Sequence, residues 1–277
     1  MKKLISLLAM IFAVGALCAS AEKTLPKADI EVVYDYTFIN PNGKMRTEQA
    51  TLLTGSEMSK YFNRRSEWVD SMESTPRGRA EMKLMINQAV SSYIGGNKNV
   101  DMPHRHPIRH YAVKSLKDGK MRFYDSAGTG LYYYDEPLGE LQWTVGDSTK
   151  TVLGYECVQA SADYHGRTWT AWFTPDIPVS DGPWKLHGLP GLILEAADST
   201  GSYSFTATGL QKSTETICAP YRRKEYDKAK RKDIYKMQIS FMINPFGGMT
   251  EDPAGNPITI KGIEAVDGYD FIETDYN

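Results

Sequence analysis

The chain has 277 residues, of which 41% are hydrophobic, and its formal net charge is −2 at pH 7. This length fits one large domain or two small ones, with enough hydrophobic residues to bury a core. So mild a charge balance argues against nucleic acid as a partner and gives no reason to expect an anionic membrane surface.

The amino terminus has the pattern of a signal peptide. Lys2 and Lys3 form a short basic region, residues 4–17 form an apolar run, and Ala19-Ser20-Ala21 supplies the small residues of a cleavage site. The run is shorter than the roughly 20 residues that span a bilayer. We therefore predict that residues 1–21 are removed. The mature protein is then exported to the periplasm, the outer membrane or the medium, without a transmembrane segment.

The mature chain, residues 22–277, reads as a single β-rich domain. Apolar and polar side chains alternate over residues 31–38, 168–174 and 202–208, which is the period of a half-buried strand. A turn signal, Asn-Pro-Asn-Gly, precedes another predicted strand at residues 45–54. Turn signals recur between these segments, so we predict a single large antiparallel sheet, mainly β in an α+β fold.

Two helices are predicted to pack on this sheet. The first begins at Ser74-Thr75-Pro76 and ends at Gly95-Gly96, because a cap, a proline and then apolar residues at helical spacing precede the glycines. The second is predicted at residues 223–243. The tail from about residue 250 is predicted to be loosely held, apart from a short strand at 258–260. A curved sheet of this kind, part-closed by a helix, resembles the periplasmic carriers of lipoproteins.

Residues 222–236 carry eight basic and three acidic side chains. We interpret them as the solvated face of the second helix. Docking to an acidic partner or to lipid headgroups is the functional alternative.

Two cysteines remain after removal of the signal peptide. Cys157 and Cys218 form an even pair in an oxidising compartment, which makes them a candidate disulfide. The alternative is that both are small buried hydrophobic residues.

A central block of aromatic and turn-forming residues carries a family resemblance. It comprises residues 154–160, 166–173, 177–178, 182–186 and the run Gly-Leu-Pro-Gly-Leu-Ile at 188–193. This block resembles the GLPGLI family, which consists of exported proteins of Bacteroidetes and has no established biochemical activity. The resemblance implies no catalytic residues. It does imply an outer-membrane transporter as a partner, because members are often encoded beside one.

The glycines around Leu189-Pro190 allow a sharp turn or a close approach to a neighbouring strand. We interpret the motif as a corner that locks the core, with a ligand-binding loop as the alternative. The candidates for lining a ligand groove are Trp169, Trp172, Trp184 and Pro190. The three tryptophans are better explained as core residues, with Trp172 the best placed to face a groove.

Three histidines, His104, His106 and His110, would share one face of an extended chain. Imidazole is the commonest protein ligand of zinc and copper, so these residues are a candidate metal site. The neighbouring Arg105 and Arg109 oppose the binding of a cation. The alternative is a polar loop that leads into a strand.

Catalytic motifs give no lead. The sequence has no Gly-x-Ser-x-Gly elbow, and its carboxylate pairs lie in turn-like stretches. The leading hypothesis is therefore a non-enzymatic binding, carrier or accessory protein that needs no cofactor. It would bind an apolar small molecule or an outer-membrane partner. The alternatives are a metal-binding protein and a hydrolase with an unrecognised site.

Overall fold

The structure is a computed structural model, and it describes residues 25–41, 43–104, 108–139, 141–243 and 269–276. The predicted signal peptide, His106 and the predicted strand at 258–260 lie outside the described residues. Most of the tail beyond residue 250 does so too, and its residues 269–276 are taken up below.

The described strands form one twelve-stranded sheet in the order β12-β6-β5-β4-β3-β2-β1-β11-β10-β9-β8-β7. Neighbouring strands pair antiparallel, except that β12 lies parallel to β6. The prediction of a large antiparallel sheet is confirmed. The strands are β1 (Ile30–Ile39), β2 (Met45–Thr54), β3 (Met58–Phe62), β4 (Tyr111–Ser115), β5 (Lys120–Ala127), β6 (Gly130–Pro137), β7 (Thr144–Val152), β8 (Tyr155–Tyr164), β9 (Arg167–Thr174), β10 (Leu192–Asp198), β11 (Tyr203–Lys212) and β12 (Asp227–Lys228).

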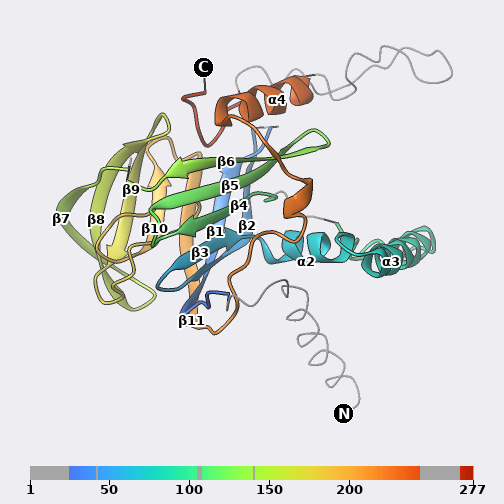
Figure 1. The fold of residues 1–277 in the computed structure, drawn as a ribbon, viewed down its shortest axis with the longest axis horizontal. Coiled ribbons are helices and arrows are strands. Elements are labelled where there is room, and N and C mark those ends of the chain that lie inside the picture. The colour runs from blue at the N-terminus through green and yellow to red at the C-terminus, as the bar shows by residue number, and fades with distance from the viewer. Residues whose placement is uncertain (1–24, 42, 105–107, 140, 244–268, 277) are drawn as a thin grey trace.

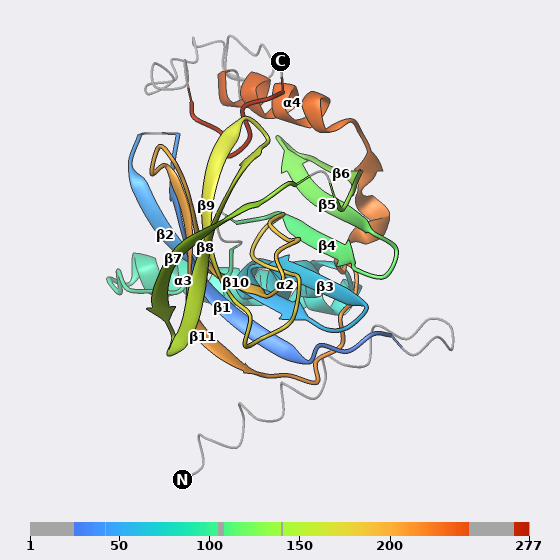
Figure 2. The same cartoon turned by 90° about the vertical axis from the view of Figure 1, so that its left-hand side faces the viewer.

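The sheet is strongly curved, with β4–β6 on one side and β7–β9 on the other (Figure 2). Aromatic side chains from both sides meet on its concave face: Phe123 of β5, Trp169 of β9 and Phe205 of β11 belong to one buried cluster. Trp184, from the loop between β9 and β10, is wholly buried in the same cluster. The concave face is thus packed with side chains.

A second, smaller cluster lies on the opposite face. Successive side chains of a strand point to opposite faces of a sheet. Leu52 and Tyr61 accordingly join the first cluster, whereas their neighbours Leu53 and Phe62 join the second. Consecutive apolar residues in β2 and β3 therefore contribute side chains to both clusters.

Three α-helices, one more than predicted, lie in the described part of the chain: α2 (Arg64–Glu73), α3 (Pro76–Ile94) and α4 (Arg231–Ile243). The predicted caps of α3 are confirmed, because the Thr75 side chain accepts from the Gly78 amide at 3.0 Å and Gly95 is the C-cap. Helix α2 was not predicted; Asn63 caps it by accepting from the Ser66 amide at 2.8 Å. Only Val69 among its apolar residues is buried, so its hydrophobic pattern is weak.

The predicted start of the second helix at residue 223 is wrong. Residues Arg223–Glu225 form a short 3-10 turn, β12 follows, and α4 begins only at Arg231. Tyr226 packs against Tyr124 of β5, with ring centroids 5.0 Å apart, and this contact holds the segment against the sheet. The basic stretch 222–236 is therefore not one solvated helix face. None of the helices in the described residues is long and apolar enough to cross a membrane.

A buried ion pair anchors the loop between β9 and β10. The Lys114 Nζ atom donates to Asp181 Oδ1 at 2.7 Å and to the carbonyl oxygens of Gly182 and Leu186 at 2.8 and 3.0 Å. Both charged side chains are fully buried. Further along the loop, Gly191 packs so closely on β9 that a Cβ atom there would lie 2.2 Å from the Thr174 carbonyl oxygen. The Gly188–Ile193 motif is therefore a packed corner.

Candidate functional site

Residues 269–276, which we call the clasp segment, lie across the turn between β8 and β9 and beside α4 (Figure 1). The Thr274 amide donates to the His165 carbonyl oxygen at 2.9 Å, and its hydroxyl donates to the Gly166 carbonyl oxygen at 3.0 Å. His165 and Gly166 both have positive φ, 50° and 80°, as the central residues of a type I′ hairpin turn do. The turn between β8 and β9 thus supports the clasp segment through two hydrogen bonds.

Five charged or titratable side chains line the space beneath the segment, and we call them the charged cleft. They come from β6, the β8–β9 turn, β9, the β9–β10 loop and α4: Glu136, His165, Arg167, Lys185 and Arg231. The cleft thus combines residues that are distant in the sequence.

Glu273 of the clasp segment inserts its carboxylate into the cleft and is fully buried. Its Oε1 atom lies 2.6 Å from Lys185 Nζ, and Arg231 pairs with its Oε2 atom. Lys185 is also fully buried, and its Nζ atom is 2.8 Å from Glu136 Oε2. The rings of Phe123 and Tyr134 lie 4.9 and 4.7 Å from the same ammonium group, so aromatic faces complete its surroundings.

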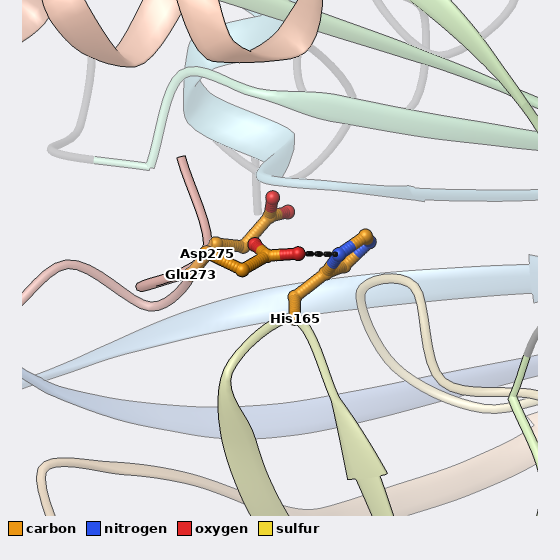
Figure 3. Close-up of side chains that lie close together, drawn as sticks. All are labelled: His165, Glu273 and Asp275. Carbon is orange, nitrogen blue, oxygen red and sulfur yellow. Dashed lines mark hydrogen bonds and ion pairs between the residues drawn. The ribbon is translucent and has the colours of Figure 1, made fainter. Parts of the chain in front are cut away.

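Asp275 forms the second acidic anchor. Arg231 contacts both of its carboxylate oxygens, Nη1 with Oδ1 at 2.6 Å and Nη2 with Oδ2 at 2.9 Å. His165 Nδ1 lies 3.3 Å from Asp275 Oδ2, the contact drawn in Figure 3, with Glu273 beside it. Bidentate pairing of this kind is among the stronger polar contacts in proteins.

Arg167 contacts the backbone of the clasp segment. Its Nε atom donates to the carbonyl oxygens of Phe271 and Ile272 at 3.2 and 3.0 Å, and its guanidinium also pairs with Asp270. Asp198 of β10 holds the other edge of the guanidinium, with its Oδ2 atom 2.7 Å from Nη1. Arg167 is therefore held by Asp198 of the sheet and contacts the backbone of the clasp segment.

The surrounding charges lower the pKa values of the carboxyl groups. Burial raises the pKa of Glu136, but the hydrogen bond from His165 and the charge of Lys185 outweigh it and lower the pKa to about 2. The pKa of Asp275 is also lowered, because the hydrogen bond and charge of Arg231 outweigh the effect of burial. Both groups are thus carboxylates at neutral pH.

The cluster offers three atoms of metal-ligating type. Ligand atoms of His165, Glu273 and Asp275 lie within 4.8 Å of one another. Lys185 and Arg231 already neutralise these carboxylates, and a metal ion would have to displace both cations. Because like charges repel strongly in a buried site, the arrangement favours an ion-pair network over metal binding.

The predicted histidine site is described only in part. His104 is exposed, and its Nδ1 atom lies 2.6 Å from the Met102 carbonyl oxygen. The His110 ring lies between Tyr61 and Phe123, with centroid distances of 6.0 and 5.2 Å. His165, Glu273 and Asp275 form the one potential ligand group found among the described residues, and it includes neither His104 nor His110. A metal site at His104, His106 and His110 stays a prediction.

His110 gives a test by pH. Burial and the charge of Lys185 lower its pKa to about 4, whereas an unfolded histidine titrates near 6.5. The unfolded state therefore binds a proton at a higher pH than the native state does. The free energy of unfolding should fall by roughly 3 kcal/mol through this group as pH falls from 7 to below 4. Urea unfolding of the wild type and of His110→Phe across this range measures the contribution, and equal pH dependence in both proteins would contradict it.

The remaining predicted site residues have separate locations. Trp169 and Trp184 are fully buried, so they are core residues that do not line an open groove. Trp172 is partly buried, with Lys150 Nζ 4.4 Å from its ring, and Pro190 is exposed. These two stay candidates for a ligand contact.

The predicted disulfide is not formed. Cys157 lies on β8 in the first core cluster, whereas Cys218 follows Ile217, which belongs to the second. Cys157 and Ile217 thus lie on opposite faces of the sheet. A disulfide needs Cα atoms within about 7 Å.

Comparisons with known proteins give a family of unknown function and a fold likeness. A family described as "Protein of unknown function (Porph_ging)" matches residues 162–195, a segment that contains Arg167, Lys185 and the Gly188–Ile193 motif. The resemblance to the GLPGLI family by name stays a prediction. No curated protein matches the chain.

Among solved structures, the chain is similar to PNGF-II in two crystal forms, in space groups C2 and P21. The sequence identities are 18% and 17%, and the TM-score is 0.49 for each. The matches cover 76% of this chain and 32% and 33% of the PNGF-II chains, so this chain spans about one third of their length.

Proposed function

We propose that the protein is an exported, non-enzymatic binding or accessory protein whose partner is a polypeptide. The observation that carries this proposal is the way in which the charged cleft holds a stretch of peptide. Arg167 donates to two backbone carbonyl oxygens of the clasp segment, while Lys185 and Arg231 hold the Glu273 carboxylate. Contacts to backbone and to carboxylates are a common means of recognising extended peptides. Export rests on the signal-peptide pattern of residues 1–21.

An apolar small molecule is the less favoured ligand. On the concave face, Tyr36 stacks on Phe205 at 4.7 Å between centroids, and Trp169 and Trp184 pack beside them. These side chains occupy the position where a carrier would hold an apolar ligand. An outer-membrane transporter is the partner implied by the family resemblance. Its contact with this protein would be a polypeptide surface in place of an apolar small molecule.

The test is made in the protein's own host. We expect envelope fractions to contain the chain with Glu22 as its amino terminus. Chemical cross-linking there should join a polypeptide to a lysine of α4, the helix that contributes Arg231 to the cleft, such as Lys236. Lys83 on α3, a helix that lies apart from α4 in Figure 1, is the matched control and should remain unlinked. A cytoplasmic chain with an intact amino terminus would refute the proposal, and so would cross-links that favour Lys83.

A further inference from the structure

We infer that the clasp segment is an exchangeable occupant of the charged cleft, and that the cleft accepts an acidic, extended stretch of a partner polypeptide in its place. This inference rests on the proposed function and names the class of partner. The segment itself has the sequence Tyr-Asp-Phe-Ile-Glu-Thr-Asp-Tyr. It gives the pattern that the cleft recognises: an aromatic residue two positions before a glutamate, with one aspartate before the aromatic residue and another after the glutamate.

The charges of the cleft and the clasp segment are complementary. Without the clasp segment, the cleft and the adjacent Asp198 carry three cations and two carboxylates, which is a net charge of +1. The cations are Arg167, Lys185 and Arg231, and the carboxylates are those of Glu136 and Asp198. The segment brings three carboxylates, and each meets a cation: Asp270 with Arg167, Glu273 with Lys185, and Asp275 with Arg231. A peptide without these carboxylates would leave Lys185 and Arg231 to share the single carboxylate of Glu136, which is costly for partly or fully buried cations.

An aromatic anchor adds to the charge pattern. Phe271 is buried, and its ring meets Tyr235 of α4 edge to face at a centroid distance of 5.6 Å. Tyr276 stacks on the same Tyr235 ring at 5.2 Å. Because Tyr235 belongs to α4, this helix contributes an aromatic contact surface beside the charged side chains of the cleft. The cleft therefore combines an aromatic contact with placed charges, as peptide sites typically do.

The cationic side chains of the cleft also have ion-pair partners outside the clasp segment. Asp198 holds Arg167 at 2.7 Å, and Glu136 lies 2.8 Å from Lys185 and 3.4 Å from Arg231. The cleft is thus arranged for an incoming peptide before that peptide binds, which lowers the cost of binding.

The clasp segment itself adds no strand to the sheet. Within the described residues, a single backbone–backbone hydrogen bond, from the Thr274 amide to the His165 carbonyl, joins it to the sheet. Side chains make its other polar contacts. A segment held in this way opens at a lower free energy than a strand inside the sheet.

A labelled peptide with the sequence of residues 269–276 tests exchange on the full-length protein. We compare the wild type with Glu273→Gln/Asp275→Asn, which weakens the chain's own segment. Tethering gives that segment an effective concentration of about 1 mM, so for a peptide with a dissociation constant of about 10 µM the variant should bind about 100-fold more tightly. Asp147→Asn/Glu156→Gln is the control, since it makes the same charge change at exposed positions of β7 and β8. It should bind like the wild type.

Three outcomes would overturn the inference. One is a natively folded Glu273→Gln/Asp275→Asn variant that does not bind the peptide. Another is equal affinity for both double variants, and the third is equal affinity for a peptide with its glutamate and aspartates neutralised. If the variant fails to fold, hydrogen exchange of the wild type decides instead. The Thr274 amide should exchange at least about 10-fold faster than amides of β9; exchange at the same rate would make the segment a fixed part of the fold. None of these results bears on export or on cross-linking in the host, so the two proposals fail separately.

Discussion

Replacing Lys114 with methionine is expected to lower the free energy of unfolding by about 3 to 5 kcal/mol. Methionine fills much of the space but leaves the Asp181 carboxylate buried without its cation. It also removes the donor of two hydrogen bonds, to the carbonyl oxygens of Gly182 and Leu186. These hydrogen bonds anchor the loop between β9 and β10. Urea unfolding followed by tryptophan fluorescence measures the loss, because Trp184 lies in that loop.

Two further variants distinguish the cost of the unpaired buried charge from the effect of replacing any lysine. Lys114→Met/Asp181→Asn removes both charges and should recover part of the stability, since the cost lies mainly in an uncompensated charge. Lys120→Met, at an exposed position of β5, should change the free energy of unfolding by less than about 0.5 kcal/mol. A loss below about 1 kcal/mol in Lys114→Met would mean that the pair does not anchor the loop.

Much of the sheet could be predicted because its signals are local. The alternation in β1 and the Asn-Pro-Asn-Gly turn before β2 predict these strands from neighbouring residues alone. The cap at Thr75 and the proline after it predict the start of α3 in the same way. The predicted start of α4 was wrong because a contact across the fold, Tyr226 with Tyr124, overrides the local helical preference of a charged stretch.

The charged cleft could not be predicted, because its residues share no spacing. Glu136, His165 and Lys185 lie in separate elements, and each looks like an ordinary surface residue in the sequence. Only the folding of the β9–β10 loop onto the sheet buries Lys185 and makes it a partner for Glu273. One signal was present: the acidic stretch 270–275 complements the basic stretch 222–236. Of that basic stretch, Arg231 forms the contact.

The second large effect is expected at Gly191, in the central motif. A Cβ atom there would lie 2.2 Å from the Thr174 carbonyl oxygen and 3.1 Å from the Phe173 ring. Both neighbours belong to β9, and Leu192 pairs with Thr174 in the sheet, so neither can move without breaking the register. Gly191→Ala should therefore lower the free energy of unfolding by about 3 kcal/mol or more, as measured by urea or thermal unfolding.

Gly188→Ala is the matched control within the same motif. Gly188 has a φ of +95°, but the nearest side-chain atoms, in Trp143, are 3.8 Å from the position of an added Cβ. This variant meets backbone strain alone and should lose about 1 to 2 kcal/mol. A packed corner thus predicts a larger loss at Gly191, whereas a loop that only needs glycine for its backbone angles predicts a larger loss at Gly188. A larger loss at Gly188 than at Gly191 would contradict the assignment of this motif as a packed corner.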